Sequence, residues 1–322
     1  MSKPTFILFG ATGDLAKQKI LPILNNSESD IVLYSRKPTE TQFTSVVGDL
    51  DNLQPLVVYF RNQPVRKLFF YLALPPDLYI STIESIHRYF KNQDAHIALE
   101  KPFGSSLENA EKLANVVKAI GEEKFYIIDH YLAKETLITN TKRVDLEKVK
   151  TIEVTFLEKE TVSERGKFYD AVGAIKDVGQ NHMLNMLAEF INPQNKLEVL
   201  SNLKYVQGSL HTKQYEGYKL TEGVDPNSTT ETYFKAQVDY KDKKILFEAG
   251  KNMPTTKTSI KVTYLDGTNY ELVVKPNPKE TKTAHEYVID DFLSGENKYS
   301  LSMLEALVAW KITEDILHDK KD

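Results

Sequence analysis

The sequence predicts a Rossmann-like, doubly wound α/β domain, followed by an α+β domain with a large, mainly antiparallel sheet. Two observations carry this prediction. In the first part of the chain, short apolar runs alternate with segments of helical periodicity, as in βαβ units that build a parallel sheet. Later runs are longer, partly alternate with polar residues and follow one another across short turns, as in an antiparallel sheet. We therefore expect two domains, residues 1–129 and 130–322.

Short apolar runs mark the strands of the first domain, because strands buried on both faces read as continuous apolar segments. Gly10 closes the first run, and the pair Pro75 and Pro76 closes the third. We expect strands at residues 6–9, 31–34, 68–74, 96–99 and 125–128. Apolar residues at helical spacing predict helices at residues 14–24, 77–90 and 106–120.

The second half changes rhythm after residue 129. We expect a helix over Tyr131–Thr141 and one continuous helix over Ala174–Ile191, where apolar residues recur every three to five positions. The pair Asp266 and Gly267 predicts a hairpin turn. We expect strands at residues 150–156, 230–240, 244–248, 259–264 and 270–274, and final helices at residues 284–293 and 302–318.

The composition narrows the classes of function. The chain has 322 residues and a formal net charge of −4, which argues against a nucleic-acid-binding protein, since these usually carry a basic excess. It has no cysteine, so disulfides, thiolate catalysis and cysteine-ligated metals are excluded. No apolar stretch reaches the length of a membrane span, and the run at residues 6–9 is too short for a signal peptide. We expect a cytoplasmic protein that binds neither membranes nor nucleic acid.

A glycine turn follows the first predicted strand. Residues 10–15 read GATGDL, and such a turn lets backbone N–H groups at the start of a helix approach a pyrophosphate. The general dinucleotide fingerprint has three glycines, but Thr12 and Leu15 stand at its second and third positions. A purely structural turn explains Gly10 and Gly13 equally well, so the loop alone leaves the choice open.

The end of the second strand bears on the choice of cofactor. An NAD site has Asp or Glu here to hold the ribose hydroxyls. The sequence instead has Arg36 and Lys37, and two cations suit the 2′-phosphate of NADP. The alternative is a solvated basic strand end. We therefore expect NADP as the cofactor, with NAD as the second choice.

Several segments, taken in order, resemble the glucose-6-phosphate dehydrogenase family. The most specific are residues 128–134 (IDHYLAK), similar to the family's DHYLGK signature with Ala133 for glycine, and residues 176–182 (KDVGQNH), similar to its RDVxQNH segment. Trp310 also has a counterpart. Further similar segments are residues 9–17 (FGATGDLAK), 34–36 (YSR), 70–76 (FYLALPP), 100–104 (EKPFG), 214–217 (QYEG) and 249–251 (AGK). The resemblance covers nearly the whole chain.

The resemblance implies an oxidoreductase that oxidises C1 of D-glucose 6-phosphate with NADP, in the pentose phosphate pathway. Histidine suits the base for the C1 hydroxyl proton, because its pKa lies near neutrality; the resemblance assigns that role to His182. A base needs an orienting carboxylate. Asp177 lies five residues before His182, about 140° away around an ideal α-helix, so Asp129 is the better partner, as the resemblance also implies.

The remaining site residues follow from the resemblance. It implies that Glu158 and Asp177 hold sugar hydroxyls, and that Lys251 contacts the sugar or its phosphate. Lys101 would contact both substrate and cofactor. The 6-phosphate would be bound by His130, Tyr131 and Lys134. The implied cofactor contacts are Gly10, Thr12, Gly13, Asp14, Leu15, Arg36, Leu74, Pro75, Tyr79 and Lys101. No metal is expected.

The chain departs from the family pattern in several places. It is much shorter than the family norm, with truncations between Arg36 and Leu68 and between Pro278 and Thr283. The family usually has a second cation shortly after the lysine at position 251; here Thr256 stands at that spacing and Lys257 follows. Lys275 stands where the family often has glutamine. The resemblance also implies a homodimer formed through the C-terminal sheet.

Two alternatives to this function stay open. The same machinery could serve a different sugar or sugar phosphate. The chain could also be a catalytically inactive relative that binds nucleotide, although Asp129 and His182 are both retained.

Overall fold

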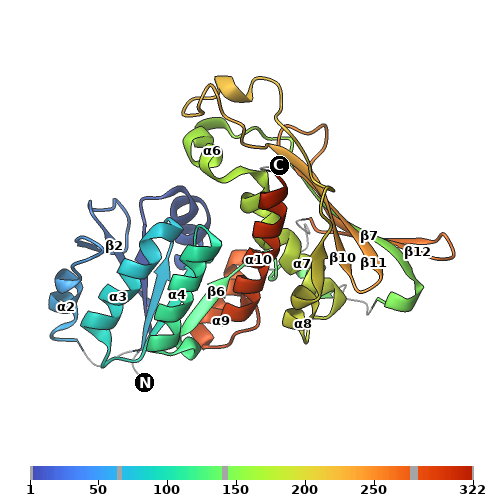
Figure 1. Cartoon of the computed structure of the whole chain (residues 1–322). Helices are drawn as coiled ribbons and strands as arrows, with labels where there is room; N and C mark the ends of the chain where they lie inside the picture. The colour runs from blue at the N-terminus through green and yellow to red at the C-terminus, as the bar shows by residue number, and fades with distance from the viewer. Residues whose placement is uncertain (1–2, 64–66, 140–143, 276–281, 321–322) are drawn as a thin grey trace. The chain divides into compact units, whose positions relative to one another are not determined.

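The computed structural model describes residues 3–63, 67–139, 144–275 and 282–320 (Figure 1). The chain divides into two compact units. The first comprises Met1–His130 and Lys282–Met303, and the second comprises Tyr131–Thr281 and Leu304–Asp322. The first unit therefore ends one residue after the boundary that we predicted. It also takes in a later segment, which our division placed in the second domain.

The first unit is built on a seven-stranded sheet with the order β14-β6-β5-β4-β1-β2-β3. All neighbouring strands are parallel except β14, which runs antiparallel to β6. The strands are β1 (Thr5–Phe9), β2 (Asp30–Ser35), β3 (Thr44–Val47), β4 (Leu68–Leu72), β5 (Ala95–Glu100), β6 (Phe125–Ile128) and β14 (Ser300–Leu301). Because β1 and β4 are buried along their whole length, β4 and β1 from Phe6 onward read as unbroken apolar runs.

Helices cover both faces of this sheet. Phe90 of α3 packs against Phe70 on one face, while Phe292 of α9 meets Phe6 and Tyr71 edge-on from the other. The helical segments are η1 (Ala16–Ile20), α1 (Leu21–Leu24), α2 (Gln54–Phe60), η2 (Pro76–Leu78), α3 (Tyr79–Phe90), α4 (Leu107–Ile120), η3 (Glu122–Lys124) and α9 (Ala284–Ser294). This arrangement confirms the predicted doubly wound class.

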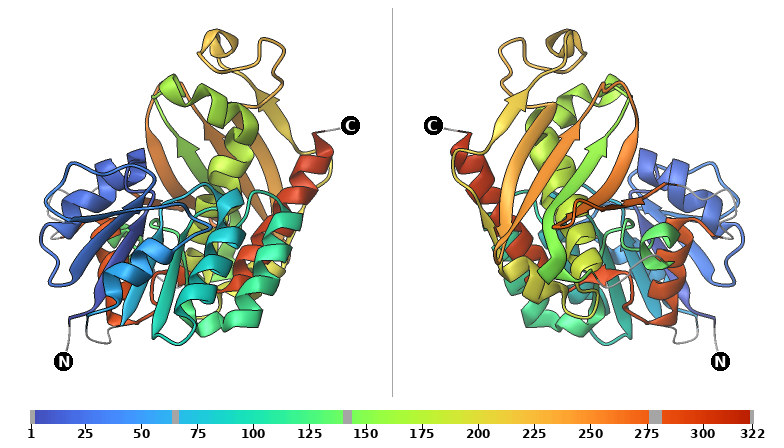
Figure 2. Two further views of the ribbon diagram at one scale, coloured as in Figure 1. Left: turned by 90° about the vertical axis from the view of Figure 1, so that its left-hand side faces the viewer. Right: turned by 90° about the vertical axis from the view of Figure 1, so that its right-hand side faces the viewer.

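The second unit is built on another seven-stranded sheet, whose long strands lie side by side in Figure 2. Its order is β13-β12-β7-β11-β10-β8, and β9 also pairs with β10. The strands are β7 (Val149–Leu157), β8 (Leu203–Tyr205), β9 (His211–Lys213), β10 (Tyr233–Tyr240), β11 (Lys243–Gly250), β12 (Lys257–Tyr264) and β13 (Asn269–Val273). Among the strands within the described residues of this unit, only β7 and β11 pair in parallel, which confirms the mainly antiparallel sheet.

The helix that carries Asp177 and His182 in the second unit is wound as a π-helix in its first part. The segment η6 (Ile175–Met183) is this π-helix, and α7 (Leu184–Ile191) continues it. The other helical segments are α5 (Glu135–Thr139), η4 (Leu146–Lys148), η5 (Ser163–Arg165), α6 (Gly166–Ala174), α8 (Lys196–Ser201), η7 (Tyr218–Leu220) and α10 (Met303–Asp319). In the described part of the chain, no helix combines the length and apolar character that crossing a membrane requires.

Several local predictions can be compared with these elements. The hairpin turn at Asp266 and Gly267 is confirmed, with Gly267 at φ +85° between β12 and β13. The predicted helix over Tyr131–Thr141 was wrong in its bounds, because the helix begins only at Glu135 and a turn precedes it; residues 140 and 141 lie outside the described ranges. The predicted α-helix over Ala174–Ile191 was wrong in its winding, because its first half is a π-helix.

Candidate active site

The carboxyl ends of parallel strands collect many of the predicted site residues at one edge of the first unit's sheet. The order β3-β2-β1-β4-β5-β6 reverses direction between β1 and β4, and ligands of open α/β sheets bind at such a switch point. The loop from Gly10 to Leu15 follows β1, Arg36 follows β2, Leu74 and Pro75 follow β4, Lys101 follows β5, and Asp129 follows β6.

The turn at Gly10 has a structural cause of its own. Gly10 has φ +77°, and a Cβ there would lie 2.2 Å from the carbonyl oxygen of Ala73. Any other residue would therefore push the end of β1 away from the segment after β4. Thr12, Gly13 and Asp14 are exposed, so the rest of the loop is open to a ligand. The glycine at position 10 thus says little about a cofactor, whereas the exposed residues after it can meet one.

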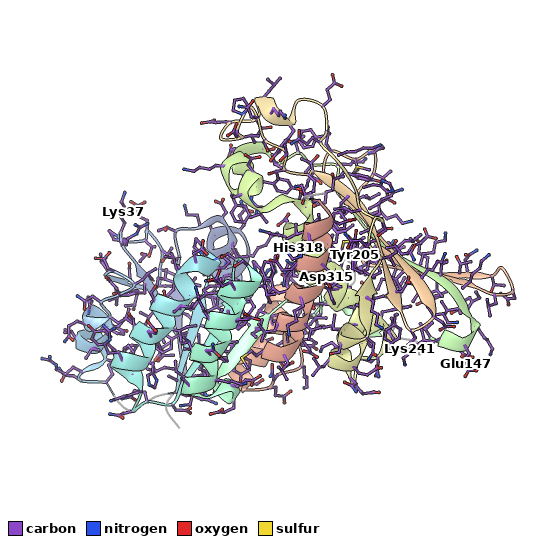
Figure 3. All side chains as sticks on the ribbon, viewed as in Figure 1. Lys37, Glu147, Tyr205, Lys241, Asp315 and His318 are labelled. Atoms are coloured by element: carbon purple, nitrogen blue, oxygen red, sulfur yellow. The ribbon has the colours of Figure 1, made fainter. Side chains whose placement is uncertain are left out.

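The turn after β2 presents its two cations to solvent. Arg36 and Lys37 are both exposed, and Figure 3 shows Lys37 extending outward. The hydroxyl of Ser35 donates a hydrogen bond to the carbonyl of Lys37 at 2.6 Å, which holds the turn. A guanidinium at the end of β2, with no carboxylate in the turn, fits the 2′-phosphate of NADP.

A buried carboxyl group directly precedes Lys101. Glu100 is 6% exposed. The hydroxyl of Tyr71 donates to its carboxylate, and the hydroxyl of Tyr79 donates to its backbone carbonyl at 2.7 Å. The hydroxyl of Tyr79, which we predicted as a cofactor contact, is therefore engaged within the fold. The peptide bond between Lys101 and Pro102 is cis.

Burial raises the pKa of Glu100 to about 7, against the opposing effects of the Tyr71 hydrogen bond and the Lys101 charge. A raised folded-state pKa favours folding below the ordinary value of 4.5, and this contribution is lost as the pH rises through about 7. Relative to Glu100→Gln, the wild type should therefore lose up to about 3 kcal/mol of unfolding free energy between pH 4.5 and 7.

Urea denaturation at several pH values would measure this difference. The exposed Glu84 on α3 supplies the control, because Glu84→Gln should follow the wild-type curve at every pH. Parallel curves for wild type and Glu100→Gln would show that Glu100 ionises normally.

Asp129 and His130 directly follow strand β6 of the first unit. Asp129 is fully buried. The ring of His130 stacks on that of His285 in α9, with centroids 4.6 Å apart and planes 20° apart. Sequence reasoning missed His285, because a single histidine in the first turn of an amphipathic helix carries no distinguishing pattern. His285 places a second imidazole beside His130, which we predicted to bind phosphate.

In the second unit, His182 lies among aromatic rings. Its ring centroid is 4.2 Å from that of Tyr131 and 5.9 Å from that of Phe156, which is nearly parallel to it. The Lys134 ammonium lies over the Tyr131 ring, with Nζ 5.5 Å from the ring centroid. Three predicted site residues, Tyr131, Lys134 and His182, are therefore gathered in one place. Although Tyr131 and Lys134 were expected on one helix, they are joined instead by a turn, in which the Lys134 N–H donates to the Tyr131 carbonyl at 3.1 Å.

A second group joins Glu158, Asp177 and Lys251. The Lys251 ammonium pairs with the Glu158 carboxylate and lies 3.6 Å from an Asp177 oxygen, and its side chain is only 12% exposed. Strand pairing explains the meeting, because β7 and β11 run in parallel with Leu157 opposite Gly250, so the next residue of each strand leaves the same edge. Two carboxylates around one ammonium form a polar cluster suited to sugar hydroxyls.

The winding of η6 changes the relation between Asp177 and His182. We predicted the two side chains to lie about 140° apart on an α-helix. In a π-helix the backbone bonds run from i to i+5, so residues five apart lie close to one turn apart. The prediction of wide separation was therefore wrong in its geometry. Asp177 lies beside Lys251, so its carboxylate belongs to the group that also contains Glu158.

The second cation that the family usually has after the lysine at position 251 is not replaced by Lys257. The Lys257 ammonium forms an ion pair with Glu271 on β13 at 2.7 Å. The hydroxyl of Thr256 accepts a hydrogen bond from the Lys159 N–H at 3.2 Å. Lys275 is exposed after β13. The lysine that follows Thr256 is thus held by its own sheet.

Comparison with known proteins gives a consistent result. The family model described as "Glucose-6-phosphate dehydrogenase, NAD binding domain" matches residues 42–140. The model described as "Glucose-6-phosphate dehydrogenase, C-terminal domain" matches residues 142–199 and 189–277. Together these models cover most of the chain.

Two curated relatives are glucose-6-phosphate 1-dehydrogenases. That of Borreliella burgdorferi is 29% identical, over 72% of this chain and 64% of the relative. Glucose-6-phosphate 1-dehydrogenase 1 of Mycobacterium bovis is 31% identical, over 80% of this chain and 68% of the relative. The chain thus spans about two thirds of the length of the curated relatives that it matches.

Solved structures share the fold. The glucose-6-phosphate 1-dehydrogenase of Mycobacterium avium has a TM-score of 0.85 and 22% identity, covering 98% of this chain and 92% of that one. A glucose-6-phosphate dehydrogenase in complex with its substrate glucose 6-phosphate has a TM-score of 0.83 and 21% identity, with the same coverage. From the family models and the Mycobacterium bovis relative, this chain belongs to the glucose-6-phosphate dehydrogenase family.

Proposed function

We propose that this chain transfers a hydride from C1 of D-glucose 6-phosphate to NADP and yields 6-phosphoglucono-1,5-lactone, the first step of the pentose phosphate pathway. The observation that carries the proposal is the gathering of His182, Tyr131 and Lys134, which brings a candidate base next to two groups suited to a phosphate. Membership of the family and the likeness to a relative solved with glucose 6-phosphate support the same reaction.

His182 is the proposed catalytic base. It takes the proton of the C1 hydroxyl as the hydride leaves C1, so that the carbon becomes the carbonyl carbon of the lactone. Tyr131 and Phe156 pack against its ring and restrict its orientation. Asp129, two residues before Tyr131 in the chain, is the proposed partner that orients the imidazole and stabilises its charged form.

The substrate is proposed to bind through two groups of residues. Glu158, Asp177 and Lys251 hold the sugar, because their carboxylates accept from hydroxyls and their ammonium donates to them. The 6-phosphate meets Lys134, Tyr131 and His130, with Lys134 as the permanent cation. Lys101 completes the site beside the cofactor.

The residues at the sheet edge fit NADP. The exposed loop residues Thr12, Gly13 and Asp14 would hold its pyrophosphate, Leu15 and the segment at Leu74 and Pro75 would flank it, and Arg36 would hold its 2′-phosphate. When bound, NADP supplies the hydride acceptor. Tyr79 contributes through the fold, because its hydroxyl holds the Glu100 carbonyl just before Lys101.

Replacing Arg36 by Ala should weaken the preference for NADP. The 2′-phosphate would lose its bidentate partner, and hydrogen bonds to charged groups contribute about 1.5–3 kcal/mol each. The KM for NADP should therefore rise about tenfold or more, while the KM for NAD changes less than about twofold. Steady-state kinetics with both cofactors would measure this. Arg61→Ala, at the end of α2, serves as the matched control; an equal effect of both variants would remove Arg36 from the cofactor site.

The substrate proposal is tested by the absorbance of NADPH. The chain is incubated with NADP and, in turn, glucose 6-phosphate, glucose, galactose 6-phosphate and mannose 6-phosphate. Rapid NADPH formation with glucose 6-phosphate supports the proposal. Faster turnover of another sugar would favour the related dehydrogenase, and NADPH formation with none of them would favour an inactive relative.

We further propose a cytoplasmic homodimer that forms through the large sheet. Leu246 is 42% exposed on β11. It lines a groove of about 330 Å³ together with Lys235 and Glu248. Light scattering on the purified chain would give its mass, and a monomer at micromolar concentration would contradict the dimer.

A further inference from the structure

A buried glutamate holds the first turn of the helix that carries Asp177 and His182. Glu231 lies just before β10 and is 2% exposed. One of its carboxylate oxygens accepts a hydrogen bond from the Ile175 N–H at 3.1 Å, and its backbone carbonyl accepts one from the Ala174 N–H at 3.1 Å. These are donors at a helix start, where no intrahelical acceptor is available. Glu231 thus caps η6 from a segment more than fifty residues away.

The chain before this helix is shaped to admit the carboxylate. Gly173 has φ +72°, which interrupts the helical path between α6 and η6. A Cβ at Gly173 would lie 2.4 Å from a carboxylate oxygen of Glu231. Ala174 at the N-cap position provides no side-chain hydrogen bond. The cap of this helix therefore depends on Glu231.

A lysine after α10 neutralises the capping carboxylate. The ammonium of Lys320 pairs with the second carboxylate oxygen of Glu231. The preceding residue, Asp319, accepts hydrogen bonds from the Tyr205 hydroxyl and, at 2.7 Å, from the Gln207 side chain. Figure 3 labels Tyr205 and His318 in this region. The end of α10 is thus fastened to the segment after β8, which leaves Lys320 in place to meet Glu231.

The segment that contains Glu231 also contacts the proposed sugar-binding residues. The carbonyl of Thr232, the residue after Glu231, accepts a hydrogen bond from the Lys251 N–H at 2.8 Å. The hydroxyl of the buried Tyr169 is influenced by both groups: burial raises its pKa well above 10, and the charges of Asp177, Glu231 and Glu158 raise it further. The Lys251 ammonium lies 5.8 Å from the Tyr169 ring. Glu231 is therefore close to the residues that we assign to the sugar.

We propose that Glu231 and Lys320 are positioning residues, which fix the start of η6 and thereby place Asp177 and His182 for the reaction. The inference rests on the proposed function for its catalytic consequence, but the fastening of the helix is a property of the fold. Because Glu231 is only 2% exposed, while the Lys320 side chain is 26% exposed, removing the lysine leaves an uncompensated buried carboxylate beside the helix start. The helix would then lose its fixed first turn.

The test compares Lys320→Met, Lys320→Arg and Glu231→Gln with the wild type. Lys241→Met is the matched control, because Lys241 pairs with Glu198 at 3.6 Å in a half-exposed position on the same unit (Figure 3). Hydrogen exchange of the amides of residues 175–183 measures how firmly the helix is held. Steady-state kinetics, corrected for the folded fraction, measures the catalytic consequence.

We expect exchange of these amides to speed up about tenfold or more in Lys320→Met and to return to near the wild-type rate in Lys320→Arg. The kcat for glucose 6-phosphate should fall about tenfold in Lys320→Met, with the KM for NADP changed less than about twofold. Glu231→Gln keeps an oxygen acceptor for Ile175 but loses the charge, so it should fall between these two. Lys241→Met should match the wild type.

Unchanged exchange in Lys320→Met, or no recovery in Lys320→Arg, would overturn the fastening. Faster exchange with an unchanged kcat would overturn the positioning role. If the wild type does not oxidise glucose 6-phosphate, the proposed function fails, and the exchange comparison still decides whether Glu231 and Lys320 hold the helix.

Discussion

Replacing His182 by Asn should lower kcat by about 10²- to 10⁴-fold, the range for losing a general base. Asparagine can fill much of the space between Tyr131 and Phe156, but it cannot take up the C1 proton. The affinity for NADP should stay within about twofold of the wild type, because His182 is assigned to the proton and not to the nucleotide. Steady-state kinetics and equilibrium titration with NADP would separate these two effects.

The exposed His211 on β9 offers a matched control for this variant. His211→Asn makes the same chemical change on the same unit, and it should leave kcat unchanged. If His182→Asn retained more than about a tenth of the wild-type kcat, the base would have to be another residue. A drop in NADP affinity equal to the drop in kcat would show instead that the variant disturbs the whole fold.

Replacing Lys251 by Met should destabilise the fold by about 3 kcal/mol at neutral pH. The side chain is only 12% exposed between Glu158 and Asp177, and removing one partner of a buried ion pair costs about 3–5 kcal/mol. We expect the lower end, because Glu158 is 29% exposed and can be partly hydrated. Urea denaturation would give the free energy of unfolding of both proteins.

The control is Lys261→Met on strand β12 of the same sheet. Lys261 pairs with Glu153 at 3.0 Å, but its side chain is 37% exposed, so this variant should cost less than about 1 kcal/mol. Equal losses in both variants would mean that Lys251 acts as a surface cation.

The strands of the first unit could be predicted because strands of a parallel sheet are buried on both faces and are therefore apolar at consecutive positions. The runs at residues 6–9 and 125–128 are apolar throughout and are strands in the structure. β3 escaped prediction because its four residues are all at least partly exposed, so it has no apolar run. The two-residue strand β14 is too short to leave any pattern.

The second unit shows what a single sequence does not encode. Apolar residues recur every three to five positions over residues 175–191, a spacing that fits an α-helix and a π-helix alike. The kink at Gly173 and the contact with Glu231 at the start of this helix involve a residue 56 positions away, so the local pattern does not predict them. Lys251 and Glu158 are 93 positions apart, and they meet because of a parallel strand pair that no local signal predicts. Likewise, the sequence placed Glu100 only in the segment 100–104 that resembles the family. It did not predict the burial beside Tyr71 that raises the pKa of Glu100 to about 7.

The central claim is that a hydride leaves C1 of glucose 6-phosphate for NADP. It is tested most directly with D-glucose 6-phosphate that carries deuterium at C1, incubated with the chain and NADP, followed by mass spectrometry of the nucleotide product. We predict that each NADPH formed carries one deuterium. NADPH without deuterium, or no reduced nucleotide at all, would contradict the claim.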